Sequence, residues 1–244
     1  MTAARAIARA LRQCLWAAWL GWTTLAAAVA AAPTACSPPA LPARAPTLAG
    51  FLPAGWHITQ QVQADLNADG RVDAVLLAQP LAPEQPAAAV AGADAGWSPP
   101  RLLLVLLRSG AGWTLAAQNH RLVPRVDLSS HEDPLANGEL SARRGGFRLN
   151  LGLAATMGSY QQATLRYSFR RQGGCVRLVA FERLELHRAT LATQDLHIDY
   201  LRGTVLHRNG NAQTEASQQR RERLPAQPRR CLPDLDDAAS FKPL

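Results

Sequence analysis

Oxygen-bearing side chains recur at alternate positions in one short segment, 65–73, whose sequence is DLNADGRVD. A glycine stands at its sixth position, where it permits a tight turn, and an apolar stretch follows the last carboxylate. Several oxygen ligands supplied by one short loop are what a hard cation such as calcium requires. The segment therefore predicts a structural Ca²⁺ site with five ligand positions: the side chains of Asp65, Asn67, Asp69 and Asp73 and the backbone carbonyl of Arg71.

The residues around this loop distinguish it from an EF-hand. The twelfth position, where an EF-hand has a bidentate Glu, is Leu76. The flanking sequences favour strands, so the predicted site is a strand–loop–strand hairpin. A second interpretation stays open, in which the loop is an Asx-rich turn without metal, because Asn, Asp and Gly are also ordinary turn residues. If calcium binds, we expect it to stabilise the hairpin by binding only the folded state.

Residue types that serve in hydrolases gather in segment 129–133, SSHED. The members of a catalytic triad normally converge from separate parts of a fold, which favours a polar loop here. The sequence therefore predicts a non-catalytic protein. A hydrolase with a site around His131, Glu132 and Asp133 is the alternative.

The other histidines give no stronger signal for catalysis. His187, His197 and His207 recur every ten residues without the spacing of a metal site. His197 and Asp199 lie on one face of a predicted strand, but no nucleophile motif such as G-x-S-x-G accompanies them. A surface hydrogen bond between these two side chains is the expected arrangement.

The N-terminal segment 1–32 predicts export. Three arginines precede an apolar run, 15–32, which ends in small residues, and this pattern is typical of a signal peptide cleaved near Ala31 or Ala32. A retained membrane anchor is the alternative, because about 18 apolar residues are enough to span a bilayer. Lipidation of Cys36 is a second alternative, for which Pro33 is a poor match. The expected location is periplasmic or secreted.

The charge balance argues against a nucleic-acid partner. The formal net charge is +8, and without the three leader arginines it is 8 − 3 = +5. The densest basic cluster, 220–230, contains no aromatic residues of the kind that interleave in nucleic-acid surfaces. The expected partner is an unidentified envelope protein or glycan. Peripheral attraction to an anionic membrane is an open alternative.

Three cysteines follow the leader: Cys36, Cys175 and Cys231. An oxidising compartment allows one pair to form a disulfide. We expect the pair Cys175–Cys231, because Cys36 lies in the Pro/Ala-rich segment 33–49, which is typical of a linker.

The remaining chain predicts an all-β domain over 50–208, a mostly antiparallel meander or sandwich-like sheet with little helix outside the leader. Apolar runs and alternating segments bounded by Gly-rich turns indicate strands at 56–62, 72–78, 101–108, 113–117, 147–153, 163–169, 176–182, 198–201 and 204–206. Segment 79–100, rich in Ala, Pro and Gly, is expected to be a flexible insertion. Segment 209–244 is expected to be a polar, poorly ordered tail unless Cys231 attaches it to the domain.

The loop at 65–73 and the apolar run Ala74–Leu77 resemble one unit of the FG-GAP or VCBS-type repeat, D-x-N-x-D-G-x-x-D before a strand. The preceding FLPAGW, 51–56, resembles the lead-in of single-unit exported bacterial proteins of unassigned function. Segments 101–107, 131–135 and 199–203 are also similar to that group. The resemblance implies a binding or interaction module, with the cation ligands at the five positions given above. Repeat families build propellers from several units, and this chain has one, so a propeller is not expected.

Overall fold

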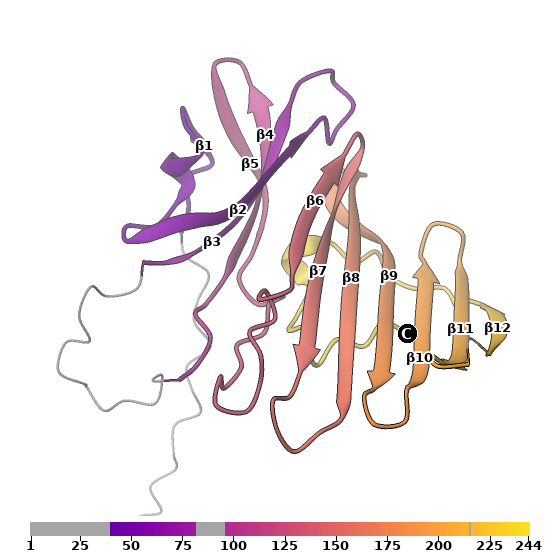
Figure 1. The fold of residues 1–244 in the computed structure, drawn as a ribbon. Helices are drawn as coiled ribbons and strands as arrows, with labels where there is room; N and C mark the ends of the chain where they lie inside the picture. The colour runs from indigo at the N-terminus through magenta and orange to yellow at the C-terminus, as the bar shows by residue number, and fades with distance from the viewer. Residues whose placement is uncertain (1–39, 82–95, 215) are drawn as a thin grey trace, which may run out of the picture. The chain divides into compact units, whose positions relative to one another are not determined.

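The computed structural model describes residues 40–81, 96–214 and 216–244 (Figure 1). In these residues the protein is all-β, as predicted, because 54% of them are in strands and 3% are helical. Every strand pairing in the described residues is antiparallel. The strands are β1 (Arg44–Ala45), β2 (Trp56–Ala64), β3 (Asp73–Pro80), β4 (Leu102–Ser109), β5 (Gly112–Asn119), β6 (Glu139–Arg143), β7 (Gly146–Ala154), β8 (Gln161–Gln172), β9 (Cys175–His187), β10 (Ala192–Asp199), β11 (Thr204–Asn211) and β12 (Ser217–Arg223). Two short 3-10 helices are η1 (Ala49–Phe51) and η2 (Leu232–Asp234).

The strands form two sheets. The smaller has the order β1-β5-β4-β3-β2, and the larger is a seven-stranded meander running from β12 to β6. Figure 1 shows β6 to β12 in succession along the larger sheet. Its strands alternate in burial, as β7 does with Phe147, Leu149 and Leu151 buried and Arg148 and Asn150 half-buried. The sheet therefore has one face in the core and one polar face.

The five-stranded sheet is buried on both faces. On one face, Val75, Leu77 and Leu103 join a core with Phe147, Tyr167 and other inward side chains of the larger sheet. On the other face, Leu76 and Leu104 pack against Phe51 in a second cluster. Burial on both faces explains why β3 and β4 are continuous apolar runs rather than alternating ones.

The segment expected to be a linker, 33–49, is in part a layer of the fold, so that expectation is wrong for its second half. β1 pairs with β5, and Leu41 and Leu48 pack against the cluster around Phe51. A Pro-rich chain can supply this layer because an extended segment and one 3-10 turn place isolated apolar residues on a sheet without a long helix. Residues 33–39, Cys36 among them, and the leader 1–32 lie outside the described residues.

The C-terminal segment is folded onto the domain, which corrects the expectation of a poorly ordered tail. The predicted Cys175–Cys231 disulfide is confirmed, with its Cα atoms 5.9 Å apart. The Leu178 N–H donates to the Arg230 carbonyl at 2.9 Å, and Leu232 is fully buried in the core between the sheets. A few buried apolar residues are enough to hold this segment on the domain once the disulfide fixes its position. For this reason the polar composition of 209–244 wrongly suggested a poorly ordered tail.

The expected insertion, 79–100, is only partly described. Residues 79 and 80 end β3, Trp97 forms a bridge with Asp127, and Ser98 is buried. Residues 82–95 lie outside the described part. Among the residues that the structure describes, no helix is long and apolar enough to cross a bilayer.

Candidate functional site

The predicted cation loop connects β2 to β3 and turns back on itself through its own side chains. The Asp65 carboxylate accepts hydrogen bonds from the Asp69 N–H at 3.2 Å and the Gly70 N–H at 3.1 Å. The Asn67 side-chain oxygen accepts from the same Asp69 N–H at 3.1 Å. Gly70 has a φ of 82°, a conformation in which glycine alone is unstrained. The oxygens of Asp65 and Asn67 therefore converge on one amide of the loop.

Asp69 lies at the exposed end of the same arrangement. Its carboxylate accepts from the Arg71 N–H at 2.8 Å and from the Asn67 side-chain amide at 3.0 Å. The Arg71 N–H, followed by the Asn67 amide, lowers the pKa of Asp69 below its ordinary value. The group is thus ionised at neutral pH, as a cation ligand must be.

Asp73, the fifth predicted ligand, points elsewhere. It is fully buried, and one carboxylate oxygen accepts from the Leu66 N–H at 2.9 Å. The other accepts from the Arg108 N–H at 2.9 Å, which joins the loop to the end of β4. In this position Asp73 braces the loop, because it fixes the backbone immediately after Asp65.

The loop also touches the larger sheet. The Gly145 N–H, in the turn between β6 and β7, donates to the Asp65 carbonyl at 2.7 Å. The Arg144 side chain of the same turn lies 3.7 Å from the Asp65 carboxylate. Leu66 is buried in the core that both sheets share. The loop therefore stands where the two sheets meet.

The donor chemistry suits calcium at four of the five predicted positions. Asp65, Asn67 and Asp69 provide hard side-chain oxygens on one loop, and the carbonyl of Arg71 follows in the same turn. Within 40–81, 96–214 and 216–244, no group of three or more His, Cys, Asp or Glu side chains is gathered as a metal site. The side-chain ligands that the loop offers are two carboxylates, Asp65 and Asp69, and the amide of Asn67. The Asp73 carboxylate is not among them, because it accepts from the Leu66 and Arg108 N–H groups.

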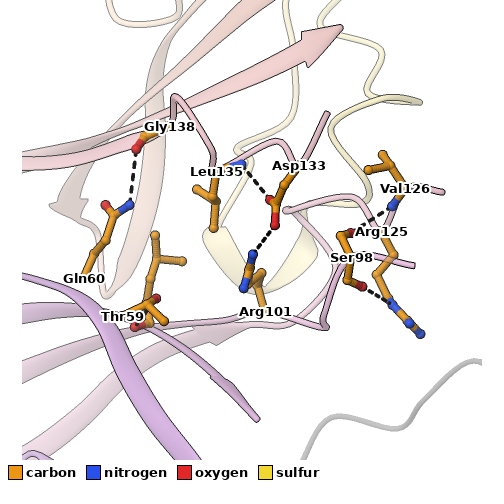
Figure 2. Close-up of polar contacts among 10 residues, drawn as sticks. Thr59, Gln60, Ser98, Arg101, Arg125, Val126, Asp133, Leu135 and Gly138 are labelled. Carbon is orange, nitrogen blue, oxygen red and sulfur yellow. Dashed lines mark hydrogen bonds and ion pairs between the residues drawn. The ribbon is translucent and has the colours of Figure 1, made fainter. Parts of the chain in front are cut away.

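The alternative hydrolase residues are not assembled as one site. Figure 2 shows Arg101 pointing at Asp133, with 2.5 Å between Nη2 and Oδ2, while the other Asp133 oxygen accepts from the Leu135 N–H. His131 is exposed, and its Nδ1 lies 2.9 Å from the Ser130 hydroxyl. Glu132 is exposed as well. Asp133 thus pairs with the arginine that begins the apolar run of β4, and its carboxylate orients no histidine.

The polar contacts around Asp133 connect the two sheets. Gln60 on β2 donates to the Gly138 carbonyl at 3.2 Å (Figure 2). Its side-chain oxygen accepts from the Leu140 N–H at 2.9 Å. Arg101 is 8% exposed, and burial lowers the pKa of its guanidinium while Asp133 opposes that shift. The Arg101 guanidinium is thus paired through Nη2, while its buried Nε has no hydrogen-bond partner.

Two of the other histidines, His187 and His207, have local partners. The His187 ring accepts from the Thr190 N–H at 3.1 Å, and His207 lies 3.3 Å from Glu222. His197 and Asp199 occupy alternate positions of β10 and so share its polar face. The hydrogen bond expected between them is not formed, because the Asp199 carboxylate accepts from the Leu201 and Arg202 N–H groups instead.

Four arginines that were not predicted as site residues line a hollow on the larger sheet. The hollow has a volume of about 470 Å³, and its arginines are Arg143, Arg148, Arg170 and Arg202. In the sequence these arginines are visible only as charged residues at the polar positions of separate segments. That they lie close together becomes apparent only when the pairing register of the strands is known.

Comparisons of the chain with protein-family models, with curated proteins and with solved structures found no match. The resemblance of segment 65–73 to an FG-GAP or VCBS-type unit stays a prediction.

Proposed function

We propose that the protein is an exported, envelope-associated and non-catalytic binding module held together by one structural Ca²⁺ ion. The observation that carries the proposal is the position of the 65–73 loop. It lies at the junction of the two sheets, where the Gly145 N–H donates to the Asp65 carbonyl. A cation bound there would connect the β2–β3 hairpin firmly to the larger sheet. The Cys175–Cys231 disulfide supports an oxidising compartment, such as the periplasm or the exterior.

In this proposal the ion is held by the side-chain oxygens of Asp65, Asn67 and Asp69 and by the carbonyl of Arg71. Asp73 acts as a brace through its bonds to the Leu66 and Arg108 amides. The ion would neutralise the negative charges of Asp65 and Asp69. It would also make the loop more rigid, because its bonds to the ligand oxygens would add to the hydrogen bonds from the loop amides.

Calorimetric titration of Ca²⁺ into the chelator-treated protein tests the site. Asp69→Asn keeps an oxygen for the Arg71 N–H but removes one charge, so Ca²⁺ affinity should fall by about tenfold or more. Asp127→Asn is the matched control, because Asp127 accepts the Ser129 N–H in the same way at 2.9 Å in a different loop. At a concentration of 100 times Kd the ion should stabilise the wild-type fold by about 2.7 kcal/mol. Equal binding by wild type and Asp69→Asn, or no saturable heat, would reduce the segment to an Asx-rich turn.

A hydrolase remains the second candidate, favoured by one contact. The Ser130 hydroxyl lies 2.9 Å from His131 Nδ1, and His131 and Glu132 line a hollow of about 510 Å³. An activated serine needs such a base within hydrogen-bond reach. Turnover of a simple ester that disappears in both Ser130→Ala and His131→Ala, with the melting temperature unchanged, would favour this role over the binding module.

A further inference from the structure

The polar face of the seven-stranded sheet contains a row of short side chains. The register makes Ser168 on β8 a cross-strand neighbour of both Arg148 on β7 and Ala180 on β9. Ala180 is in turn opposite Asp199 on β10, and Ser141 on β6 is opposite Arg148. Short side chains at the middle of this row leave the hollow of about 470 Å³, which is the size of a small-molecule site.

Local irregularities of the backbone form the hollow. Val179 is an extra residue in β9, because the register shifts between Ser168 and Phe169, and such bulges re-aim neighbouring side chains. Gly146 lies beside the same point, where a Cβ atom would be 2.3 Å from the Phe169 carbonyl oxygen. Only glycine therefore allows the β6–β7 turn to approach β8 this closely.

The charge in the hollow is strongly positive. Four arginines and one carboxylate line it, which gives a formal charge of 4 − 1 = +3. The carboxylate, Asp199, accepts from the Leu201 N–H at 2.9 Å and the Arg202 N–H at 2.8 Å, so it serves as the cap of the β10–β11 turn. Its side chain is also 3.8 Å from Arg202 Nε.

The other three arginines are not neutralised. Arg148 donates to the Ser168 hydroxyl at 3.3 Å, which is a neutral partner. In the part of the chain that the structure describes, neither Arg143 nor Arg170 has an ion pair. Of the two acids nearest on this face, Glu182 is paired with Arg166 at 3.2 Å, and Glu139, two positions from Ser141 on β6, is exposed to solvent. Three guanidinium groups from three neighbouring strands therefore line one hollow whose single carboxylate, Asp199, is paired with the fourth arginine, Arg202.

We propose that this hollow binds a ligand carrying phosphate esters, held by Arg143, Arg148 and Arg170. The guanidinium fork matches phosphate oxygens two at a time, and several forks around one hollow suit a group of more than one negative charge. The ligand is either a soluble phosphorylated molecule or the headgroup of an anionic lipid, since both present the same chemistry. The inference gives the proposed binding module its ligand class, and it rests on that proposal for its biological meaning only.

The test is calorimetric titration of inorganic pyrophosphate into the full, calcium-free protein at low ionic strength. Saturable binding is expected, with affinity reduced about tenfold or more in Arg148→Gln and Arg170→Gln. Arg171→Gln is the matched control, because Arg171 is the exposed neighbour of Arg170 and does not line the hollow. Unchanged melting temperatures would establish that the variants are folded.

Two outcomes would overturn the inference. One is the absence of saturable pyrophosphate binding by the wild type. The other is an equal loss in Arg170→Gln and Arg171→Gln, which would mean that net charge alone attracts the anion. Sedimentation with phosphatidylglycerol and phosphatidylcholine vesicles distinguishes the sources. Binding to the anionic vesicles that requires Arg170 identifies a headgroup, and pyrophosphate binding without vesicle binding identifies a soluble ligand. Because calcium is absent throughout, these results are independent of the loop at 65–73.

Discussion

Removing the disulfide should weaken this fold more than most single core substitutions. Cys175 and Cys231 are separated by 56 positions in the sequence. For a closed loop of that length the chain-entropy relation gives about 14 cal/mol/K, or about 4 kcal/mol at 25 °C. In a domain of this size that corresponds to a melting temperature lower by about 10 °C. The replacement Cys175→Ser/Cys231→Ser should therefore lower the free energy of unfolding by about this amount.

The assay is urea unfolding followed by tryptophan fluorescence. Both serine replacements are made in a Cys36→Ser background, so that the third cysteine cannot form a new pair, and Cys36→Ser alone is the control. If residues 224–244 detach, the urea dependence m should also fall, because Leu232 and its buried neighbours no longer contribute surface to the transition. A loss smaller than about 1 kcal/mol with unchanged m would refute the reasoning, since the loop would then cost little entropy to close.

Four further changes test the contacts described above. Arg101→Ala leaves the Asp133 carboxylate in a largely buried position without its partner and should cost about 3 kcal/mol of unfolding free energy, whereas Arg101→Met with Asp133→Leu should recover most of it. Tyr167→Phe should be neutral or stabilise by up to about 1 kcal/mol in urea unfolding, because the buried hydroxyl has no hydrogen-bond partner. The lowered pKa of Asp69 predicts a contribution to stability that is complete above its ordinary pKa of 3.8 and is lost as the pH falls through the lowered value. Unfolding midpoints of wild type and Asp69→Asn should accordingly converge in acid. Burial raises the pKa of Tyr200 to about 12, so its contribution is present below about pH 10 and lost as the pH rises through 12. Ultraviolet titration should show its ionisation only with alkaline unfolding.

The sequence predicted strands well wherever burial imposes a period or an unbroken apolar run. Segment 101–108 became β4 and segment 163–169 lies within β8. Strands β6 and β12 were missed because they are edge strands of a meander, where one partner strand and little burial are enough. The sequence RRER, at the end of β12, has no apolar alternation, so nothing local distinguishes it from a solvated tail. Its pairing with β11 is a tertiary effect.

The candidate loop was predictable in position but only partly in geometry. The Asx and Gly residues at 65–70 determine a turn from local hydrogen bonds alone, and they form it. The orientation of Asp73 depends on the Arg108 amide at the end of β4, 35 positions away. The Arg101–Asp133 pair is equally remote in sequence. Contacts of this kind leave no local signal, whereas a loop that closes on itself does.

On the larger sheet, the residues that stabilise the fold and the residues proposed to bind a ligand lie on opposite faces. The inner face is filled by stacked aromatics such as Phe147 and Phe169, whose ring centroids are 4.9 Å apart, and a truncation there leaves a cavity. The outer face around Ser168 carries small and charged side chains whose exchange removes no core contact. If the arginines were present only for solubility, scattered positions would serve as well as three neighbouring strands around one hollow. An alanine scan of this sheet should therefore divide cleanly, with inner-face changes lowering the unfolding free energy and outer-face arginine changes lowering anion affinity at constant stability. A scan in which the arginine changes cost stability instead would assign the hollow to folding rather than to recognition.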